Sequence, residues 1–238
     1  MVIGATISYV FVKNEYKQAN NIVENISTIN TKTEISNLEK EAIEEYVNII
    51  LKREIAIKIQ EFDDINNADK VWIYSHIDAV DDSHYITKEQ IKKQLINTFG
   101  NNLILDVDND IKAMDNIIFD KENDKYELLP YGMDNKVCYY INTVNKVDKE
   151  YIVNVIEYNK MSDLYADDIE DKDIIISAYD ENITKSFKWK EIFRMDKDTS
   201  NLDIENEILK RKYEFQSYNI TIIQNDEGLY NVIKIKEV

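Results

Sequence analysis

Asp106, Asp108 and Asp110 stand at alternate positions in LDVDNDIKAMD, as the first ligands of an EF-hand calcium loop do. Such a loop also needs glycine at its sharp turn and a bidentate carboxylate at its last position. In this chain Ile111 takes the place of the glycine, and Ile117 takes the place of the carboxylate. We therefore expect no calcium site here and interpret the aspartates as the solvated end of a strand.

The histidines and the cysteine are the other residues that could do chemistry. His76 and His84 lie eight residues apart among aspartates and a serine. A metal or acid–base site needs groups that converge on one point, and this spacing across a helix-to-loop junction does not bring them together. Cys138 is the single cysteine, so it forms no intrachain disulfide and suits a small buried hydrophobe. We expect no catalytic residue, metal or cofactor, and therefore no enzyme.

Charge and glycine content exclude further classes of function. The net charge of −17 repels phosphate backbones, so we expect no nucleic-acid partner. A backbone phosphate-binding loop needs several glycines close together, and the chain has only four in 238 residues. The sequence also contains no nucleophile elbow and no dinucleotide fingerprint. Lys188, Lys190 and Arg194 form the one positive stripe. We interpret this stripe as a solvated strand face, with an anionic ligand or partner as the alternative.

The segment Val137–Lys160 contains two β-branched and aromatic runs joined at Asp148-Lys149, which predicts a long β-hairpin. The predicted register has three cross-strand pairs: Tyr139 with Tyr158, Ile141 with Ile156, and Val144 with Val153. Tyrosine suits both half-wet sheet faces and recognition surfaces. We expect the second face of this hairpin to hold a pocket or a contact surface for a partner, formed by Tyr140, Val144, Tyr151, Val153 and Val155.

Helical spacing of apolar residues predicts helices over Ser36–Lys52, Ala68–Val80 and Thr87–Phe99. The second of these is expected to bury Trp72. The third has a capping box formed by Thr87 with the glutamine three residues on, and a glycine at its end. Ile55–Gln60 alternates like a strand but could equally continue the first helix.

After the glycine at position 100 the apolar period changes from 3.6 to 2, which predicts strands. The expected strands are Leu103–Val107, Asn116–Asp120, Tyr126–Leu129, Ile174–Tyr179, Phe187–Met195, and a closing hairpin of Tyr213–Gln224 with Leu229–Lys236. The closing register pairs Gln224 with Leu229 and Ile220 with Ile233. Ser162–Asp173 and Asp196–Asn206 are expected to be loops.

Helices followed by antiparallel strands predict an α+β fold, with N-terminal helices packed on a curved antiparallel sheet, a meander that ends in a C-terminal hairpin. We expect an anchor remnant and polar spacer over 1–30 and one α+β domain over 31–238. Within that domain the helical part would span 31–100 and the β part 101–238.

The run Val2–Val12 is the most apolar stretch, but its eleven residues are too few to span a bilayer, which needs about 20. No basic region precedes it and no small-residue cleavage site follows it. It is either the outer half of a signal anchor or a first β-strand. The polar stretch that follows favours the anchor.

Four segments carry a resemblance: ITKEQIKKQLINTFG, IIFDKENDKYELLP, YIVNVIEYN and YEFQSYNITIIQNDEGLYNVIKI. Their succession resembles extracytoplasmic, membrane-anchored or lipoprotein-like proteins of unknown function from low-GC Gram-positive bacteria, which end in a hairpin with a tyrosine in the last strand, here Tyr230. The chain departs from them in having no complete anchor and no lipobox cysteine near its start. More loosely, the layout is similar to the nuclear transport factor 2-like or cystatin-like arrangement, which implies no function.

Taken together, these observations predict a non-enzymatic domain on the extracytoplasmic face of the cell membrane, with the cytoplasm as the alternative. It would bind a protein or cell-envelope partner through its sheet. One alternative is a small-molecule or enzymatic pocket between helices and sheet. The other is a scaffold component of a secretion or conjugation complex.

Overall fold

The computed structural model describes residues 32–51, 65–75, 77–79, 83–101, 103–112, 114, 117–129, 137–162, 173–183 and 188–238. Several predictions lie outside these residues: those for Val2–Val12, Ile55–Gln60, His76 and most of Ser162–Asp173.

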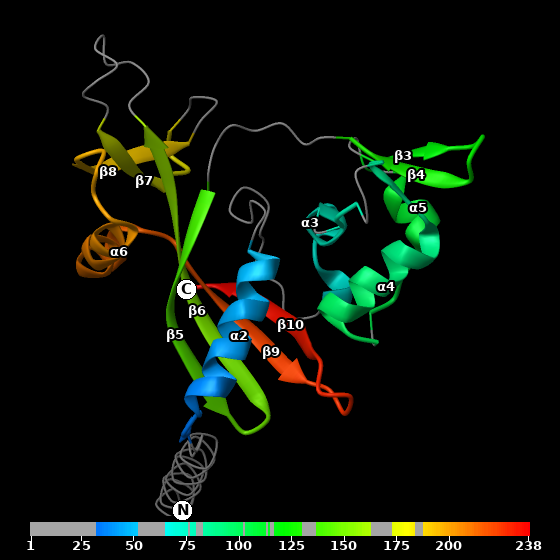
Figure 1. Cartoon of the computed structure of the whole chain (residues 1–238), viewed down its shortest axis with the longest axis horizontal. Helices are drawn as coiled ribbons and strands as arrows, with labels where there is room; N and C mark the ends of the chain where they lie inside the picture. The colour runs from blue at the N-terminus through cyan, green and yellow to red at the C-terminus, as the bar shows by residue number, and fades with distance from the viewer. Residues whose placement is uncertain are drawn as a thin grey trace, which may run out of the picture.

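Two long antiparallel strands form the centre of the protein (Figure 1). The main sheet has the order β1-β5-β6-β7-β8; in addition, β9 pairs with β6, and β10 pairs with β9. The bounds are β1 Lys32–Thr33, β5 Val137–Val147, β6 Glu150–Ser162, β7 Ile174–Tyr179, β8 Trp189–Met195, β9 Ser217–Gln224 and β10 Tyr230–Glu237. Every pairing between these strands is antiparallel.

The sheet forks along β6. One edge of β6 pairs with β5 over nearly its whole length. The other edge pairs with β9 over Glu150–Ile156 and with β7 over Asn159–Ser162. Between the two sets of partners, the amide of Glu157 donates a hydrogen bond of 3.0 Å to the backbone oxygen of Gln216. We call this point, where β9 and β7 diverge, the fork.

The described part of the chain has five α-helices, whose bounds are α2 Asn37–Ile50, α3 Lys70–Ser75, α4 Lys88–Phe99, α5 Val107–Ile111 and α6 Asn201–Lys210. Short polar side chains start the longer ones. Ser36 accepts a hydrogen bond from the amide of Glu39, and Thr87 with Gln90 forms the predicted capping box. Gly100 ends α4 at φ 87°, a left-handed conformation that favours glycine. The predictions for α2 and α4 are confirmed.

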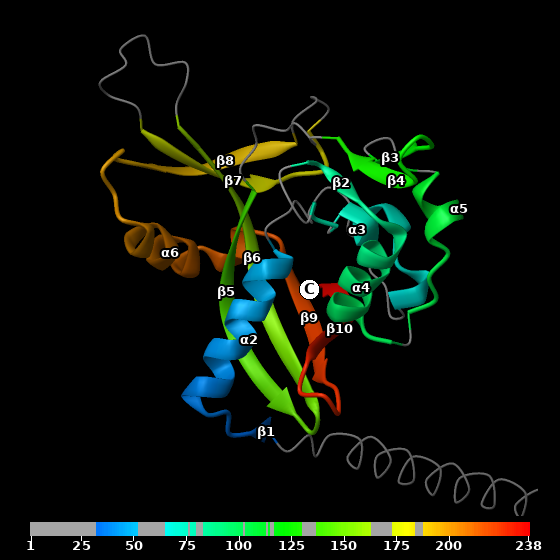
Figure 2. The same ribbon diagram turned by 45° about the vertical axis from the view of Figure 1, so that its right-hand side comes forward.

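The helices bury opposite faces of β6 in its two halves. Tyr151, Val153 and Val155 belong to a first core that includes the buried face of α2. Ile156 and Tyr158 belong to a second core that includes the buried apolar residues of α6 and of β7. Successive strand residues point to opposite faces, so α2 and α6 cover the sheet from opposite sides. Figure 2 shows α2 beside the lower half of the long hairpin and α6 beside its upper half.

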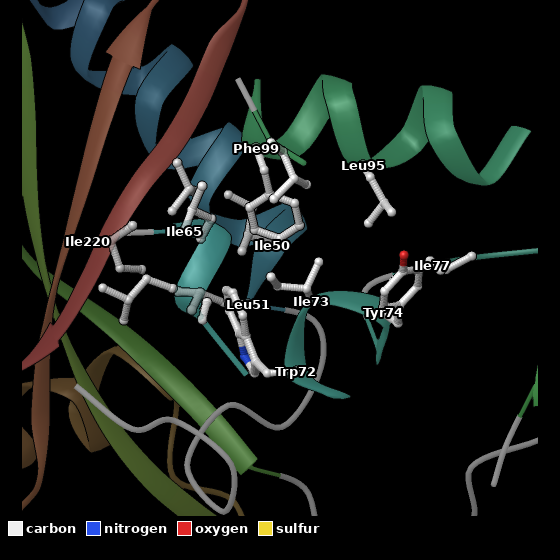
Figure 3. Close-up of a cluster of buried hydrophobic side chains, with 14 of the residues drawn as sticks. Ile50, Leu51, Ile65, Trp72, Ile73, Tyr74, Ile77, Leu95, Phe99 and Ile220 are labelled. Atoms are coloured by element: carbon white, nitrogen blue, oxygen red, sulfur yellow. The ribbon is translucent and has the colours of Figure 1, made fainter. Parts of the chain in front are cut away.

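The first core continues away from the sheet toward α3 and α4 (Figure 3). Trp72 of α3 is fully buried, as predicted, and lies edge-on to Phe99 with ring centroids 5.7 Å apart. A small sheet of order β2-β4-β3 completes this side of the molecule. Its strands are β2 Tyr85–Ile86, β4 Lys125–Leu128 and β3 Ile117–Asp120.

The fold class is the predicted one: the chain is an α+β protein with helices packed on a twisted antiparallel sheet and a C-terminal hairpin. The division into a helical front and a β rear is wrong in detail. Helices α5 and α6 lie in the part predicted to be β, and the strands β1 and β2 lie in the part predicted to be helical.

Two element predictions are wrong because a capping side chain outweighed the apolar pattern. Leu103–Val107 was predicted to be a strand, but Asp106 accepts a hydrogen bond from Asn109 and starts helix α5. Asp196–Asn206 was predicted to be a loop, but Ser200 caps the amide of Asp203 and starts helix α6. Helix α3 is also shorter than the predicted Ala68–Val80.

The predicted register of the long hairpin is right next to its turn and wrong beyond a β-bulge, and the predicted register of the closing hairpin is wrong from its turn onward. Val144 does lie opposite Val153, but an irregularity between Ile141 and Thr143 shifts the pairs beyond it, so that Ile141 faces Val155. In the closing hairpin, Gln224 faces Tyr230, and a second irregularity between Val232 and Lys234 shifts the register again. A bulge adds one residue to one strand, and sequence alternation does not reveal it.

In the part of the chain that the structure describes, no helix combines the length and apolar character needed to cross a membrane.

The second core predicts a stability difference between two residues of one helix. Ile208 of α6 is fully buried, whereas Leu202 of the same helix is 66% exposed. We expect Ile208→Ala to lower the free energy of unfolding by about 2–5 kcal/mol, because it removes buried apolar surface and leaves a cavity. We expect Leu202→Ala to change it by less than about 0.5 kcal/mol. Urea denaturation followed by circular dichroism measures both, and equal effects would contradict the placement of α6.

Candidate functional site

The part of β6 that pairs with β9, Glu150–Ile156, is its lower half. This half has one covered face and one face that we call the open face. On the side opposite α2, helix α6 packs against Ile156 and Tyr158 in the upper half of β6, and no other helix of the described residues is labelled over that side in Figures 1 and 2. On this side lie Asn154 and the half-buried Ile152 of β6, with their cross-strand partners Thr143, Asn219 and Thr221. Thr143 is exposed, and Lys234 and Lys236 of β10 are the partners of Thr221 and Asn219 on the same face. The open face is therefore polar, with a modest apolar component.

Three asparagines form a hydrogen-bonded line across this face, which we call the amide row. The side-chain Nδ2 of Asn142 donates to Oδ1 of Asn154 over 2.9 Å. Nδ2 of Asn154 donates in turn to Oδ1 of Asn219 over 2.9 Å, and more weakly to the backbone oxygen of Tyr218 at 3.4 Å. The three side chains come from β5, β6 and β9, so the row runs perpendicular to the strands.

The β-bulge in β5 places Asn142 in this row. Asn154 pairs directly with Thr143 on one side and Asn219 on the other. Asn142 is the extra residue of the bulge, and without it the residue before Thr143 would point to the opposite face. The bulge thus brings a third amide to the open face, which is why this row is not apparent from alternation in the sequence.

The amide row has a direction and a limited chemistry. Because each Nδ2 donates toward β9, the Asn142 end keeps an acceptor oxygen and the Asn219 end keeps amide N–H donors. Strands lie about 4.8 Å apart, so these ends are about 10 Å apart. Side-chain amides neither titrate near neutral pH nor act as nucleophiles. The row is therefore suited to recognising polar groups rather than to transforming them.

The five residues predicted as a contact surface do not share one face. Tyr151, Val153 and Val155 are buried in the first core, and Val144 packs against it. Tyr140 packs against the second core on the other side of the sheet. The bulge at Asn142 causes this split, because alternation before it is out of phase with alternation after it.

The aspartates of the calcium-like segment hold helix α5 in place. Asp108 forms an ion pair with Lys88 and accepts a hydrogen bond of 2.6 Å from the Tyr126 hydroxyl. Asp110 contacts Lys70 at 3.3 Å and the hydroxyl of Tyr74 at 3.2 Å. The Lys88 and Tyr126 hydrogen bonds lower the pKa of Asp108, while burial and then the Asp108 contact raise the pKa of Tyr126 to about 12. These carboxylates are at a short helix, not at the predicted strand end.

His84 and Cys138 lie in different parts of the described structure. His84 is exposed, with a left-handed φ of 59°, and its backbone oxygen accepts a hydrogen bond from Leu128. Cys138 packs against the second core. Within the described residues, no three histidine, cysteine, aspartate or glutamate side chains are grouped so that they could hold a metal ion.

The positive stripe is partly neutralised by its own strand. Nε and Nη2 of Arg194 contact the two carboxylate oxygens of Glu191 at 2.7 and 2.9 Å. Lys190 is exposed on the same strand. This pairing agrees with the interpretation of the stripe as a solvated strand face.

A cluster that sequence reasoning missed joins α2 to the tip of the long hairpin. The carboxylate of Glu39 accepts hydrogen bonds from Lys146, at 2.7 Å, and from the Tyr151 hydroxyl. Lys146 also lies over the Tyr151 ring, and Tyr151 meets Tyr230 edge-on at 5.9 Å. Glu39 is 107 residues from Lys146 in the chain, and no local pattern links them.

Comparisons with protein-family models, with curated proteins and with solved structures found no match to this chain.

The Glu39 cluster predicts an acid-dependent loss of stability. The Lys146 hydrogen bond, and then that of Tyr151, lower the pKa of Glu39 from its ordinary value of 4.5. The contribution of the cluster is therefore complete above pH 4.5 and is lost as the pH falls through the lowered pKa. We expect Glu39→Gln to reduce the free energy of unfolding by about 1–2 kcal/mol at pH 7. The difference from wild type should shrink toward pH 3, because the protonated carboxyl resembles the amide.

Urea denaturation at a series of pH values measures this difference. Glu45→Gln, at an exposed position of the same helix, serves as the control and should show little effect at any pH. A deficit of Glu39→Gln that stays constant or grows on acidification would contradict the assignment.

Proposed function

We propose that this chain is a non-catalytic binding domain that recognises a partner protein through the open face of its sheet. The observation that carries the proposal is the amide row, a line of mutually hydrogen-bonded asparagines on the open face, beyond the part of the sheet that α6 covers. The proposal concerns recognition, since amides offer hydrogen bonds and no proton-transfer or nucleophilic chemistry.

Pre-organisation supports this proposal. Each amide in the row is held by its neighbour, so little side-chain freedom remains to be lost when a partner binds. The acceptor at Asn142 and the donors at Asn219 complement the N–H and C=O groups of a polypeptide backbone. Half-buried Ile152, two residues from Asn154 on the same face, adds apolar area beside the row. Such a mixed polar and apolar composition is usual for non-obligate protein–protein interfaces.

The charge of the chain supports a protein rather than a nucleic acid as the partner. The net charge of −17 opposes any polyanion. Lys234 and Lys236 of β10 lie on the open face itself, so the face does not share the strong negative charge of the whole chain.

A location on the extracytoplasmic side of a membrane forms the second part of the proposal. Its support is the apolar run Val2–Val12, the polar stretch after it and the resemblance to extracytoplasmic anchored proteins. We expect protease added to intact cells of the source organism to digest the protein, while a cytoplasmic marker stays whole. Protection equal to that of the marker would contradict this location.

Position-specific crosslinking tests the interface. A photo-reactive amino acid at Thr143, on the open face, should give one discrete crosslinked product in cells of the source organism. The same photo-reactive amino acid placed instead at Tyr213, a surface position that is 90% exposed and not on the open face, should not give that product. Asn154→Leu should remove it, because this change breaks both hydrogen bonds of the amide row.

A binding measurement makes the test quantitative. With a peptide copied from the crosslinked segment, we expect Asn154→Leu to weaken the Kd at least about tenfold, or ~1.4 kcal/mol. Asn206→Leu, at an exposed position of α6, should leave the Kd unchanged. Equal crosslinking from Thr143 and Tyr213, or an unaltered Kd for Asn154→Leu in folded protein, would overturn the proposal.

A further inference from the structure

A second polar group of residues lies at the fork, on the face of the sheet opposite the amide row. Glu157 and Asn159 of β6 are 1% and 0% exposed, and Ser177 of β7 is 2% exposed. Asn159 and Ser177 are direct cross-strand partners, and Glu157 is two residues from Asn159, so all three side chains share one face. They follow Tyr151, Val153 and Val155 along that face, where the apolar core gives way to polar residues.

Asn159 is the informative member of this group. Neither its Nδ2 nor its Oδ1 has a hydrogen-bond partner within the described part of the chain, although its side chain is fully buried. Buried polar side chains are nearly always hydrogen-bonded, because an unsatisfied donor or acceptor loses its hydration without replacement. The Asn159 amide thus has two adjacent unsatisfied groups: an N–H donor without an acceptor and an oxygen without a donor.

Aromatic side chains surround this polar group. Tyr139 is the cross-strand partner of Glu157 on β5, and Tyr218 is buried on β9 beside Val155. Tyr179, two residues beyond Ser177, meets Trp189 edge-on with ring centroids 5.8 Å apart. Burial raises the pKa of Tyr218, and the charge of Glu157 raises it further, so this ring keeps its hydroxyl proton at neutral pH.

We propose that the fork binds a small, neutral, planar molecule that presents one hydrogen-bond donor and one acceptor side by side to Asn159. Two kinds of molecule share this chemistry: a nucleobase edge such as that of adenine, and an aromatic carboxamide. An asparagine amide pairs with either through two parallel hydrogen bonds, as it does with adenine in nucleic acids. Ser177 and Glu157 add further polar contacts, and the neighbouring tyrosines suit a flat ring.

This site is separate from the open face and does not depend on the proposed partner binding. Because Glu157, Asn159 and Ser177 are buried, a ligand enters only when the residues that cover them move apart. Association should therefore be slower than for an open site.

Adenine and benzamide are the two probes, with benzoate as the control because its carboxylate supplies acceptors but no adjacent donor. Isothermal titration calorimetry on the full chain measures affinity, and NMR follows the side-chain amide signal of Asn159. We expect saturable binding of at least one probe, a shift of that signal, and no binding of benzoate. Binding of adenine alone assigns a nucleobase ligand, and binding of benzamide alone assigns a carboxamide.

Asn159→Leu provides a variant of similar size without the amide. We expect it to weaken probe binding more than tenfold, while its unfolding midpoint without probe stays equal to that of wild type or rises. Asn154→Leu, on the opposite face, should bind the probe as wild type does. The proposal is overturned if neither probe binds, if Asn159→Leu binds equally well, or if a crystal structure shows only ordered water satisfying the Asn159 amide.

Discussion

The structure depends on how one strand is buried. The thirteen residues of β6 place Tyr151, Val153 and Val155 in one core, then Ile156 and Tyr158 in another on the opposite face. A strand that changes its buried face needs cover from both sides, which α2 supplies to one half and α6 to the other. It also needs different edge partners in each half, and the fork between β9 and β7 supplies them.

Because β6 changes which face it buries, polar residues occupy the parts of each face that do not pack against an apolar core. Each half of β6 has one face against a core and one face that no helix of the described residues covers. On the lower half this second face carries the amide row, completed by the bulge at Asn142. On the upper half it carries Glu157 and Asn159. Both proposed sites therefore arise from one feature of the fold, although they offer different chemistry. One is a half-exposed line of mutually hydrogen-bonded amides, and the other is a buried amide without partners in the described chain.

Local signals in the sequence were sufficient for the fold class, for helices α2 and α4, and for the position of the long hairpin. They failed at Asp106 and Ser200, where one capping side chain determined a helix within a weak apolar pattern. They failed again at the two bulges, because one extra residue reverses the facing of everything beyond it. The amide row and the Glu39–Lys146 contact could not be predicted, since they join residues distant in sequence through registers that only the folded sheet defines. The expected contact surface was split between two cores for the same reason.

Native-state hydrogen exchange along β6 tests most directly whether this strand unites both cores. If it does, amide hydrogens near Val153, beside the first core, and near Tyr158, beside the second, exchange only through global unfolding and report the same free energy. Core substitutions near either end, at Ile43 of α2 or Ile208 of α6, then lower both values together. Two distinct free energies, each responding only to the substitution in its own core, would contradict the account and show two units that fold independently.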